Sequence, residues 1–384
     1  MSDEPPKNSK KYTNFAVPYK LYQTVYPMQA SIPTLTQESI ALLDKLIATP
    51  SVSRDESGTA DIIEAFLKAH VKGEVKRIYN NVYVRSPHWS DARPTLLMNS
   101  HHDTVKPSAS YTRNPYEPAH EEGRIYGLGS NDAGASAVSL IAAYRYLEER
   151  ELPYNMLLAI SAEEEVMGEH GMRGLLPELG KIDMALVGEP TGMHAAVGER
   201  GLVVMDCTAH GVRGHAARNE GVNAIDVAIR DIERIRNYQF EQTSPLLGNI
   251  KMTVTQINAG TQHNVIPDEC RFVIDIRTTD AYTNEETAQL VQQLLESDAQ
   301  PRSTRVHASA IYAEHPLVQA ATAIGRDTFV SPTTSDMALM HGIPSLKMGV
   351  GQSARSHGAD EFVLESEIEE GIQLYIGFLE KLMA

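Results

Sequence analysis

The residues best suited to chemistry lie in segment 99–105, which reads Asn-Ser-His-His-Asp-Thr-Val and directly follows the apolar run 95–98. A short apolar run predicts a β-strand, and open α/β sheets bind ligands beyond the carboxyl ends of their strands. The imidazole of His101 and the carboxylate of Asp103 would therefore lie where chemistry occurs. One such cluster is weak evidence for a metal, because histidines at strand ends often only hydrogen-bond to a loop.

Four more polar clusters follow along the chain, and the middle two begin where an apolar run stops. They are Gly-Leu-Gly-Ser-Asn-Asp at 127–132, the triple glutamate 163–165, Val-Gly-Glu-Pro around Glu189, and Ser-His-Gly around His357. The middle clusters should thus emerge at the same rim as His101. An acidic run is most often a solvated face, but the apolar run before this one favours a functional interpretation. Neighbouring strand side chains point to opposite faces, so we expect the triple glutamate to lie in a loop.

Histidines and carboxylates in this combination suit divalent cations such as zinc, cobalt or manganese. The two cysteines, Cys207 and Cys270, lie away from all of the clusters, which argues against a thiolate zinc site. A single catalytic zinc needs three protein ligands, whereas this set supplies five and a spare carboxylate, so two metals are expected. Two cations can lower the pKa of a water between them from about 15.7 toward about 7, and a nearby carboxylate can then move its proton.

The five ordered clusters resemble those of the M20 metallopeptidases, a family with paired zinc ions, and the similarity runs from about Thr36 onward. The resemblance implies one metal bound by His101 and Glu189, a second bound by Glu165 and His357, and Asp132 as the bridge between them. It implies two zinc ions, with cobalt as an alternative. It also makes Glu164 the general base.

Asp103 matches the family's aspartate that orients the histidine ring, a partner that fixes the tautomer. His102 has no role in the motif, and we expect it to be a rim or core histidine. The chain departs from the family after the bridging aspartate, where Ala133, Gly134 and Ala135 replace the usual Lys or Gly-Gly. The missing lysine would change the local field around the metals.

Composition indicates a globular enzyme of two domains. The chain has 384 residues, of which 42% are hydrophobic and 22% charged, and a single ordinary core would not accommodate that length. A net charge of −16 argues against nucleic acid or anionic membrane as a partner. No apolar stretch approaches the roughly 20 residues of a membrane span, and the N-terminus lacks the apolar core of a signal peptide. We therefore expect a cytoplasmic protein.

Alternating elements predict an α/β fold with a mostly parallel sheet and helices on both faces. The polar, Pro-rich residues 1–35 are expected to form a flexible arm. Folding should begin at Thr36, an N-cap before an apolar helical stripe. Further helices are expected at 59–70 and 135–149.

The pattern of apolar residues changes after residue 201. It predicts a small α+β unit with strands at 202–209, 251–257 and 270–276 and a helix at 224–236. We therefore expect a catalytic domain in two parts, 36–201 and 311–384, with an inserted domain at 202–310, which we call the lid. The resemblance implies that the lid is a ferredoxin-like sandwich and that it makes the contact of a homodimer.

The resemblance also assigns residues of the lid to the reaction. His215 falls on a position whose imidazole reaches, often from the partner subunit, toward the oxyanion of the tetrahedral intermediate. Asn264 and Arg277 match positions that bind the substrate carboxylate, a task that suits the arginine fork. Arg355, close to His357, is another candidate, although a surface salt bridge is the alternative.

Several strings, among them Pro-Thr-Thr-Ser-Asp and Ser-Ala-Arg-Ser-His, resemble the acetylornithine deacetylase branch of Bacteroidetes-type bacteria, some members of which prefer a succinyl group. This implies hydrolysis of the N2-acyl amide of L-ornithine in arginine biosynthesis. Asp336 and Glu361 are candidate partners of the free ornithine amine. The alternatives are another amidohydrolase of this family (an N-acetyl-lysine deacetylase, aminoacylase or dipeptidase) and a non-catalytic relative that binds such ligands.

Overall fold

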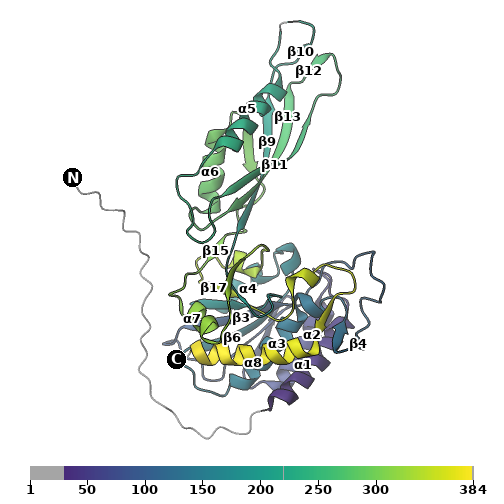
Figure 1. Ribbon diagram of the computed structural model, residues 1–384, viewed down its shortest axis with the longest axis vertical. Helices are drawn as coiled ribbons and strands as arrows, with labels where there is room; N and C mark the ends of the chain where they lie inside the picture. Colours follow the sequence, from purple (N-terminus) through teal and green to yellow (C-terminus); the bar gives the residue numbers. More distant parts are fainter. Residues whose placement is uncertain (1–29, 219, 383–384) are drawn as a thin grey trace, which may run out of the picture.

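The computed structural model describes residues 30–218 and 220–382, and in this part of the chain nine strands form the main sheet (Figure 1). Their order is β1-β2-β6-β3-β7-β17-β8-β15, and β16 pairs with β8. The pairs β3–β6, β3–β7, β7–β17 and β8–β16 are parallel. The bounds are β1 (Val75–Ile78), β2 (Asn81–Arg85), β3 (Thr95–His101), β6 (Asn155–Ser161), β7 (Met184–Val187), β8 (Ala195–Glu199), β15 (Ser309–Ala310), β16 (Thr328–Ser331) and β17 (Ser345–Lys347). The predicted α/β fold with a mostly parallel sheet is confirmed.

Helices cover both faces of this sheet, which explains why its central strands are apolar on both sides. Leu96 and Met98 of β3 join the core under one group of helices, whereas Leu97 between them joins the core on the opposite face, under α4. The helices are α1 (Ile32–Ile47), α2 (Ser57–His70), α3 (Ala135–Leu147), α7 (Pro316–Ala323) and α8 (Glu365–Leu382) on the first face and α4 (Met172–Leu179) on the other. A small sheet of β4 (Ala119–Glu121), β5 (Arg124–Tyr126) and β18 (Phe362–Leu364) lies beside them.

The first helix begins earlier than Thr36, so that prediction is wrong. Helix α1 starts at Ile32, and the hydroxyl of Ser31 accepts a hydrogen bond from the backbone of Thr34 at 3.3 Å. Pro33 fits this first turn because the missing N–H has no helical partner there. Residues 32–35 are therefore helical rather than part of an arm, and residues 1–29 lie outside the described residues.

The predicted lid has its own sheet, with the antiparallel order β11-β13-β9-β14 and two helices packed on it. Along the chain its elements are β9 (Gly201–His210), α5 (Ala224–Asn237), β11 (Lys251–Ala259), β13 (Glu269–Thr278), α6 (Asn284–Leu294) and β14 (Asp298–Pro301). This is the β-α-β-β-α-β arrangement of a ferredoxin-like unit. Its hydrophobic core shares no residue with the cores of the main sheet, which supports our proposal that 202–310 is a separate domain.

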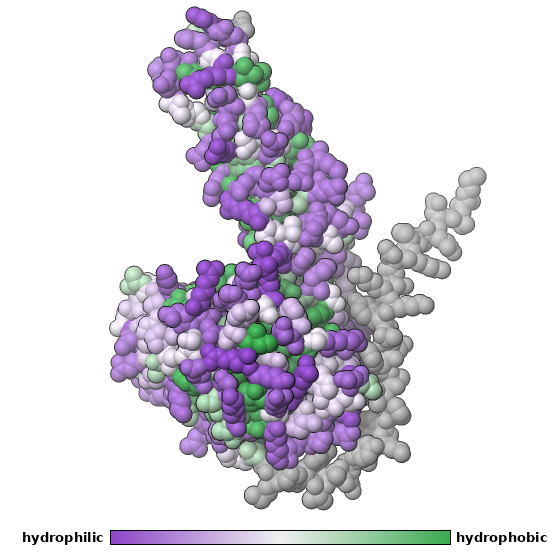
Figure 2. All heavy atoms as spheres, turned by 180° about the vertical axis from the view of Figure 1, so that it is seen from behind, coloured by the Kyte–Doolittle hydropathy of each residue, from purple (hydrophilic) through white to green (hydrophobic). Residues whose placement is uncertain are grey.

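A short ribbon of β10 (Gly214–His215) and β12 (Val265–Ile266) forms the end of the lid farthest from the main sheet (Figure 1). Figure 2 shows mostly hydrophilic residues over the visible face of the lid and a small hydrophobic group near that end. Val212 and Val222, which flank the ribbon, are 57% and 49% exposed. No helix among residues 30–218 and 220–382 has the length and apolar character needed to cross a membrane.

Candidate metal centre

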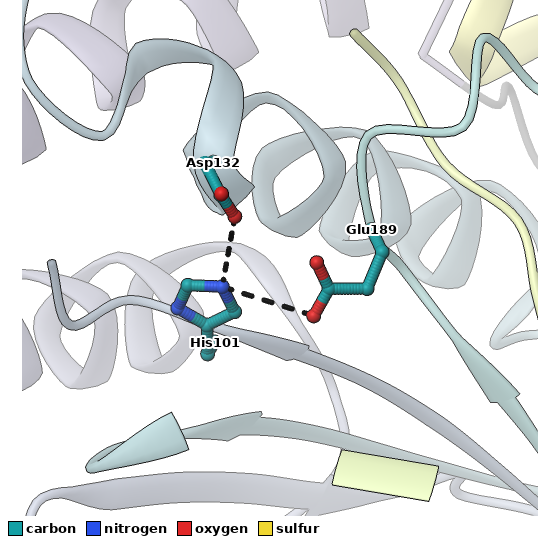
Figure 3. Close-up of side chains that lie close together, drawn as sticks. All are labelled: His101, Asp132 and Glu189. Atoms are coloured by element: carbon teal, nitrogen blue, oxygen red, sulfur yellow. Dashed lines mark hydrogen bonds and ion pairs between the residues drawn. The ribbon is translucent and has the colours of Figure 1, made fainter. Parts of the chain in front are cut away.

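The carboxyl ends of three neighbouring parallel strands bring most of the predicted site residues together. His101 is the last residue of β3, Glu164 and Glu165 begin a short 3-10 helix (Glu164–Val166) after β6, and Glu189 lies two residues beyond β7. Asp132 comes from the irregular turn before α3, and His357 follows a 3-10 turn (Ser353–Arg355) near α8. Figure 3 shows the carboxylates of Asp132 and Glu189 both pointing toward the same ring nitrogen of His101.

These side chains form two groups that share Asp132. In the first, the Nε2 atom of His101 lies 3.3 Å from Asp132 Oδ1 and 3.8 Å from Glu189 Oε1. In the second, the Nε2 atom of His357 lies 3.6 Å from Asp132 Oδ2 and 3.0 Å from Glu165 Oε2. In each group the potential ligand atoms lie within 4.8 Å of one another. These are the two sets that the sequence predicts.

Glu164 lies beside these groups but differs from its neighbour Glu165. Its Oε2 atom is 3.9 Å from His101 Nε2, and together with Glu165 these residues form a third group of potential ligands. Glu165 also contacts His357, whereas Glu164 belongs to no group that contains Asp132 or His357. Glu164 is only 7% exposed, so its carboxylate is held close to the centre without completing either set. Glu163 has a left-handed φ of 55°, which takes the triple glutamate off the strand, as predicted.

Asp103 organises both His101 and the glutamates. Its backbone oxygen lies 3.0 Å from Nδ1 of His101, and its carboxylate oxygen Oδ1 lies 3.5 Å from the same nitrogen. The same carboxylate accepts backbone hydrogen bonds from Glu164 and Glu165 and a hydroxyl hydrogen bond from Ser53 at 2.7 Å. Asp103 therefore fixes the ring of one potential ligand and the turn that carries two others.

His102 is a buried core histidine, within the expectation from the sequence of a rim or core histidine. Its ring lies 2.8 Å from the hydroxyl of Thr59 and 2.9 Å from the backbone oxygen of Asn80. Burial lowers its pKa to about 4, so the ring is neutral near pH 7.

The buried carboxylates of the cluster need positive charge nearby to remain ionised. Burial raises the pKa of Glu189 to about 8 and the pKa of Glu164 well above its ordinary value. Burial also acts to lower the pKa of His101, but its hydrogen bonds to Asp103 and Asp132 raise that pKa well above its ordinary value. Carboxylates crowded together in a buried site repel one another, and divalent cations relieve that repulsion. The donor set thus fits the two cations that the sequence predicts.

Asp336 and Glu361 are buried beneath the site and do not contact its cavity, so the structure contradicts their suggested role with a substrate amine. Glu361 is 2% exposed and accepts backbone hydrogen bonds from Gly129, Asn131 and Asp132, which fixes the turn that carries Asp132. Asp336 is 1% exposed and accepts a hydrogen bond from Ser161 at 2.7 Å. Neither carboxylate is available to a ligand.

A cavity of about 480 Å³ opens next to the clustered carboxylates. Four of the acids and His357 form part of its lining, and the remainder is a wall rich in hydroxyl and amide groups. That wall consists of Pro190, Thr191, Phe329, Ser331, Pro332, Thr333, Thr334, Lys347, Gln352, Ser353, Ala354 and Ser356. Two of the strings that carry the family resemblance, 332–336 and 353–357, contribute to this wall, but their spacing is neither metal-binding nor catalytic and did not predict that they line a cavity.

The structure does not bring the four predicted substrate-binding and oxyanion residues into this cavity. His215 and Asn264 lie close together on the terminal ribbon of the lid, where the backbone N–H of Ala216 donates to the oxygen of Asn264 at 3.0 Å. Arg277, on β13, pairs with Asp275 at 2.8 Å. Arg355 pairs with Glu367 at 2.7 Å, which favours the alternative of a salt bridge.

Comparison with known proteins agrees with this geometry. The profile of the family described as "Peptidase family M20/M25/M40" matches residues 97–381. A succinyl-diaminopimelate desuccinylase of Caulobacter sp. (strain K31) is 28% identical over 373 residues, which cover 88% of this chain and 94% of the relative.

Two solved structures show the same fold. The aminopeptidase PepT of Bacillus cereus aligns with a TM-score of 0.70 and 19% identity, over 91% of this chain and 99% of its own. The Bacillus subtilis YXEP protein, described as a dinuclear metal binding peptidase, aligns with a TM-score of 0.68 and 17% identity, over 91% and 98% of the two chains.

Proposed function

The chain belongs to peptidase family M20/M25/M40, and on that premise we propose that it hydrolyses the N2-acyl amide of N2-acetyl-L-ornithine or N2-succinyl-L-ornithine to L-ornithine and the free acid. The observation that carries the proposal is the pair of ligand groups that share Asp132, with the buried carboxylate of Glu164 beside them. Such an arrangement suits amide hydrolysis, in which cations polarise the carbonyl group and a nearby carboxylate moves a proton to the departing amine.

His101, Asp132 and Glu189 would hold one divalent cation, and Asp132, Glu165 and His357 a second, with zinc or cobalt as the metal. When bound, the cations would polarise the carbonyl of the amide and make an attacking water more acidic. The residues of the chain supply proton transfer and positioning. Glu164 accepts a proton from the water while the water oxygen attacks the carbonyl carbon. It then delivers that proton to the departing amine nitrogen.

His215 would donate a hydrogen bond to the oxygen on which negative charge develops. Its strand, β10, lies at the end of the lid far from the main sheet (Figure 1), and His215 does not line the cavity, which supports a role in the site of a partner subunit. We propose a homodimer through the lid. The exposed Val212 and Val222 and the unpaired edge of β11 offer apolar contacts and free backbone groups for such an interface.

The acyl group distinguishes two candidate substrates. The name of the Caulobacter relative favours N-succinyl-diaminopimelate, whose succinyl carboxylate calls for a positive partner. Among the described residues that line the cavity, however, there is a single lysine, Lys347, and no arginine. The Lys347 ammonium group is already paired with the carboxylate of Glu199 at 2.9 Å. This lining supports an uncharged acyl group, and hence the acetyl compound, as the preferred substrate.

The test is a comparison of kcat/KM for N2-acetyl-L-ornithine, N2-succinyl-L-ornithine and N-succinyl-diaminopimelate, using protein loaded with zinc or with cobalt. N-acetyl-methionine and a dipeptide serve as controls. A clear preference for an ornithine derivative supports the proposal. Hydrolysis of the diaminopimelate compound alone, or of the controls alone, would retain the metal centre and overturn the substrate.

A further inference from the structure

A buried ion pair lies behind the hydroxyl-rich wall of the cavity. Nζ of Lys347, the last residue of β17, is 2.9 Å from Oε2 of Glu199, the last residue of β8. The side chains are 2% and 0% exposed. Removing two charges from water costs free energy that the pair recovers only with good geometry and further hydrogen bonds. The hydrolytic roles described above assign no task to this pair.

The remaining hydrogen bonds of both charged groups go to one short segment. Lys347 donates to the backbone oxygen of Thr333 at 2.8 Å, and its Nζ lies 3.4 Å from the Thr333 hydroxyl. The carboxylate of Glu199 accepts hydrogen bonds from the backbone N–H and the hydroxyl of Ser335, at 3.1 and 2.9 Å. The two charged side chains therefore hold the chain at Thr333 and at Ser335, which are two residues apart.

The gripped segment is part of the cavity wall. Residues 331–334 all line the cavity that the clustered acids also line. Glu199 is also two residues before the start of β9, through which the chain enters the lid. The ion pair thus stands where the wall, the main sheet and the entry to the lid meet.

We infer that Lys347 is a positioning residue, which acts with Glu199 to hold wall segment 331–334 in place for the part of the substrate that does not react. The inference rests on the proposed function, because the wall is taken to contact the substrate. The positive charge of Lys347 is balanced by Glu199, and its ammonium group donates a hydrogen bond to the backbone oxygen of Thr333. Lys347 therefore positions the wall segment, and we expect its loss to weaken substrate binding more than it slows the chemical step.

The experiment compares Lys347→Met, which removes the charge and shortens the side chain by one atom, with the same change at Lys181, an 84% exposed lysine outside the cavity. Metal content, KM, kcat and hydrogen exchange are measured on each. For Lys347→Met we expect normal metal content, KM raised about tenfold and kcat within about threefold of the native value. Amide exchange in 333–335 should accelerate while exchange in α3 stays unchanged. Lys181→Met should match the native protein in all four.

An unchanged KM with unchanged exchange in 333–335 would overturn the inference, and so would a loss confined to kcat. If Lys347→Met does not fold, Ser335→Ala decides, because it removes one hydroxyl from the same grip: faster exchange and a KM raised about threefold support the inference, and native behaviour overturns it. Failure of the native protein to hydrolyse any of the tested amides would count against the proposed function instead. The exchange measurement would still show whether Lys347 holds the wall.

Discussion

The carboxylate of Asp103 accepts the backbone N–H of Glu164 at 3.0 Å, while the backbone oxygen of Asp103 lies 3.0 Å from the ring of His101. One residue thus sets the positions of a potential metal ligand and of the proposed base. His101 ends strand β3, and Glu164 lies in the turn after the neighbouring strand β6. The distance between these two side chains therefore depends on Asp103 as well as on the sheet.

Replacing Asp103 with alanine should therefore impair both metal binding and turnover. We expect the affinity for the metal to fall about 10- to 100-fold, as is usual when the partner of a ligating histidine is lost. Titration of the metal-free variant with zinc measures the affinity. Asp55→Ala, a change at an exposed acid nearby, is the control. Native affinity in Asp103→Ala would show that the strands alone position His101.

Glu164→Gln should retain metal and lose turnover by about 10²- to 10⁴-fold, because the amide has nearly the same shape but does not accept the proton. Metal content by elemental analysis and kcat by amine release are the two measurements. Glu169→Gln, at an exposed glutamate four or five residues from the glutamates of the site, should behave as the native protein. Near-native turnover in Glu164→Gln would remove this residue as the base.

Stripping the divalent cations with a chelator should abolish hydrolysis and lower the melting temperature, because the crowded carboxylates then lack their counter-charge. Addition of zinc or cobalt should restore both. The decisive quantity is the activity of protein verified to be metal-free. Persistent hydrolysis in such protein excludes the two-metal mechanism.

His215 should act across a subunit boundary. His215→Ala and Glu164→Gln should each be inactive alone, but a mixed dimer of the two contains one site with both groups intact. Random pairing in a two-fold dimer then restores roughly a quarter of the native activity. Absence of recovery in a verified heterodimer would contradict the assignment. In His215→Ala alone, the loss should fall mainly on kcat.

His120 should make stability depend on pH. Its ring lies 3.0 Å from Glu365 and 2.9 Å from Asp44, and these hydrogen bonds, that to Glu365 first, raise its pKa. The bonds stabilise the fold fully below the unfolded pKa of about 6.5, and the stabilisation is lost as pH rises through the higher folded value.

Melting temperatures of native protein and His120→Gln at about pH 5.5 and about pH 8.5 test this. Relative to the variant, the native protein should be more stable at the lower pH, and the difference should shrink at the higher pH. An equal difference at both values would show that His120 does not titrate as expected.

The sequence predicts those site residues whose position follows from a strand. His101, Glu165 and Glu189 each come directly after an apolar run, and parallel strands bring their carboxyl ends to one rim. The resemblance to a family supplies Asp132 and His357, whose turns have no comparable periodicity. The main sheet and its helices follow from the alternation of apolar segments.

Pairings between distant segments are not predictable in this way. The sequence suggests Glu361 as a partner of a substrate amine, yet Glu361 is buried under the turn of Asp132, and Arg355 pairs with a glutamate of α8. Local signals are also ambiguous: Ser31 and Thr36 are both good helix caps, and the buried Leu35 favours the earlier start. Long-range register decides these contacts, and one sequence does not contain it.

The order of the strands also has a consequence for how the protein is made. Strand β17 lies between β7 and β8, yet its residues follow the whole lid in the sequence. As the chain leaves the ribosome, the lid is complete while the main sheet is still split at its centre. All segments of the lid are thus available to pair before the main sheet is complete, and β7 and β8 lack their common neighbour until residue 347 emerges. Because His357 and Glu361 emerge later still, the two ligand groups that share Asp132 are both complete only when nearly the whole chain has been made.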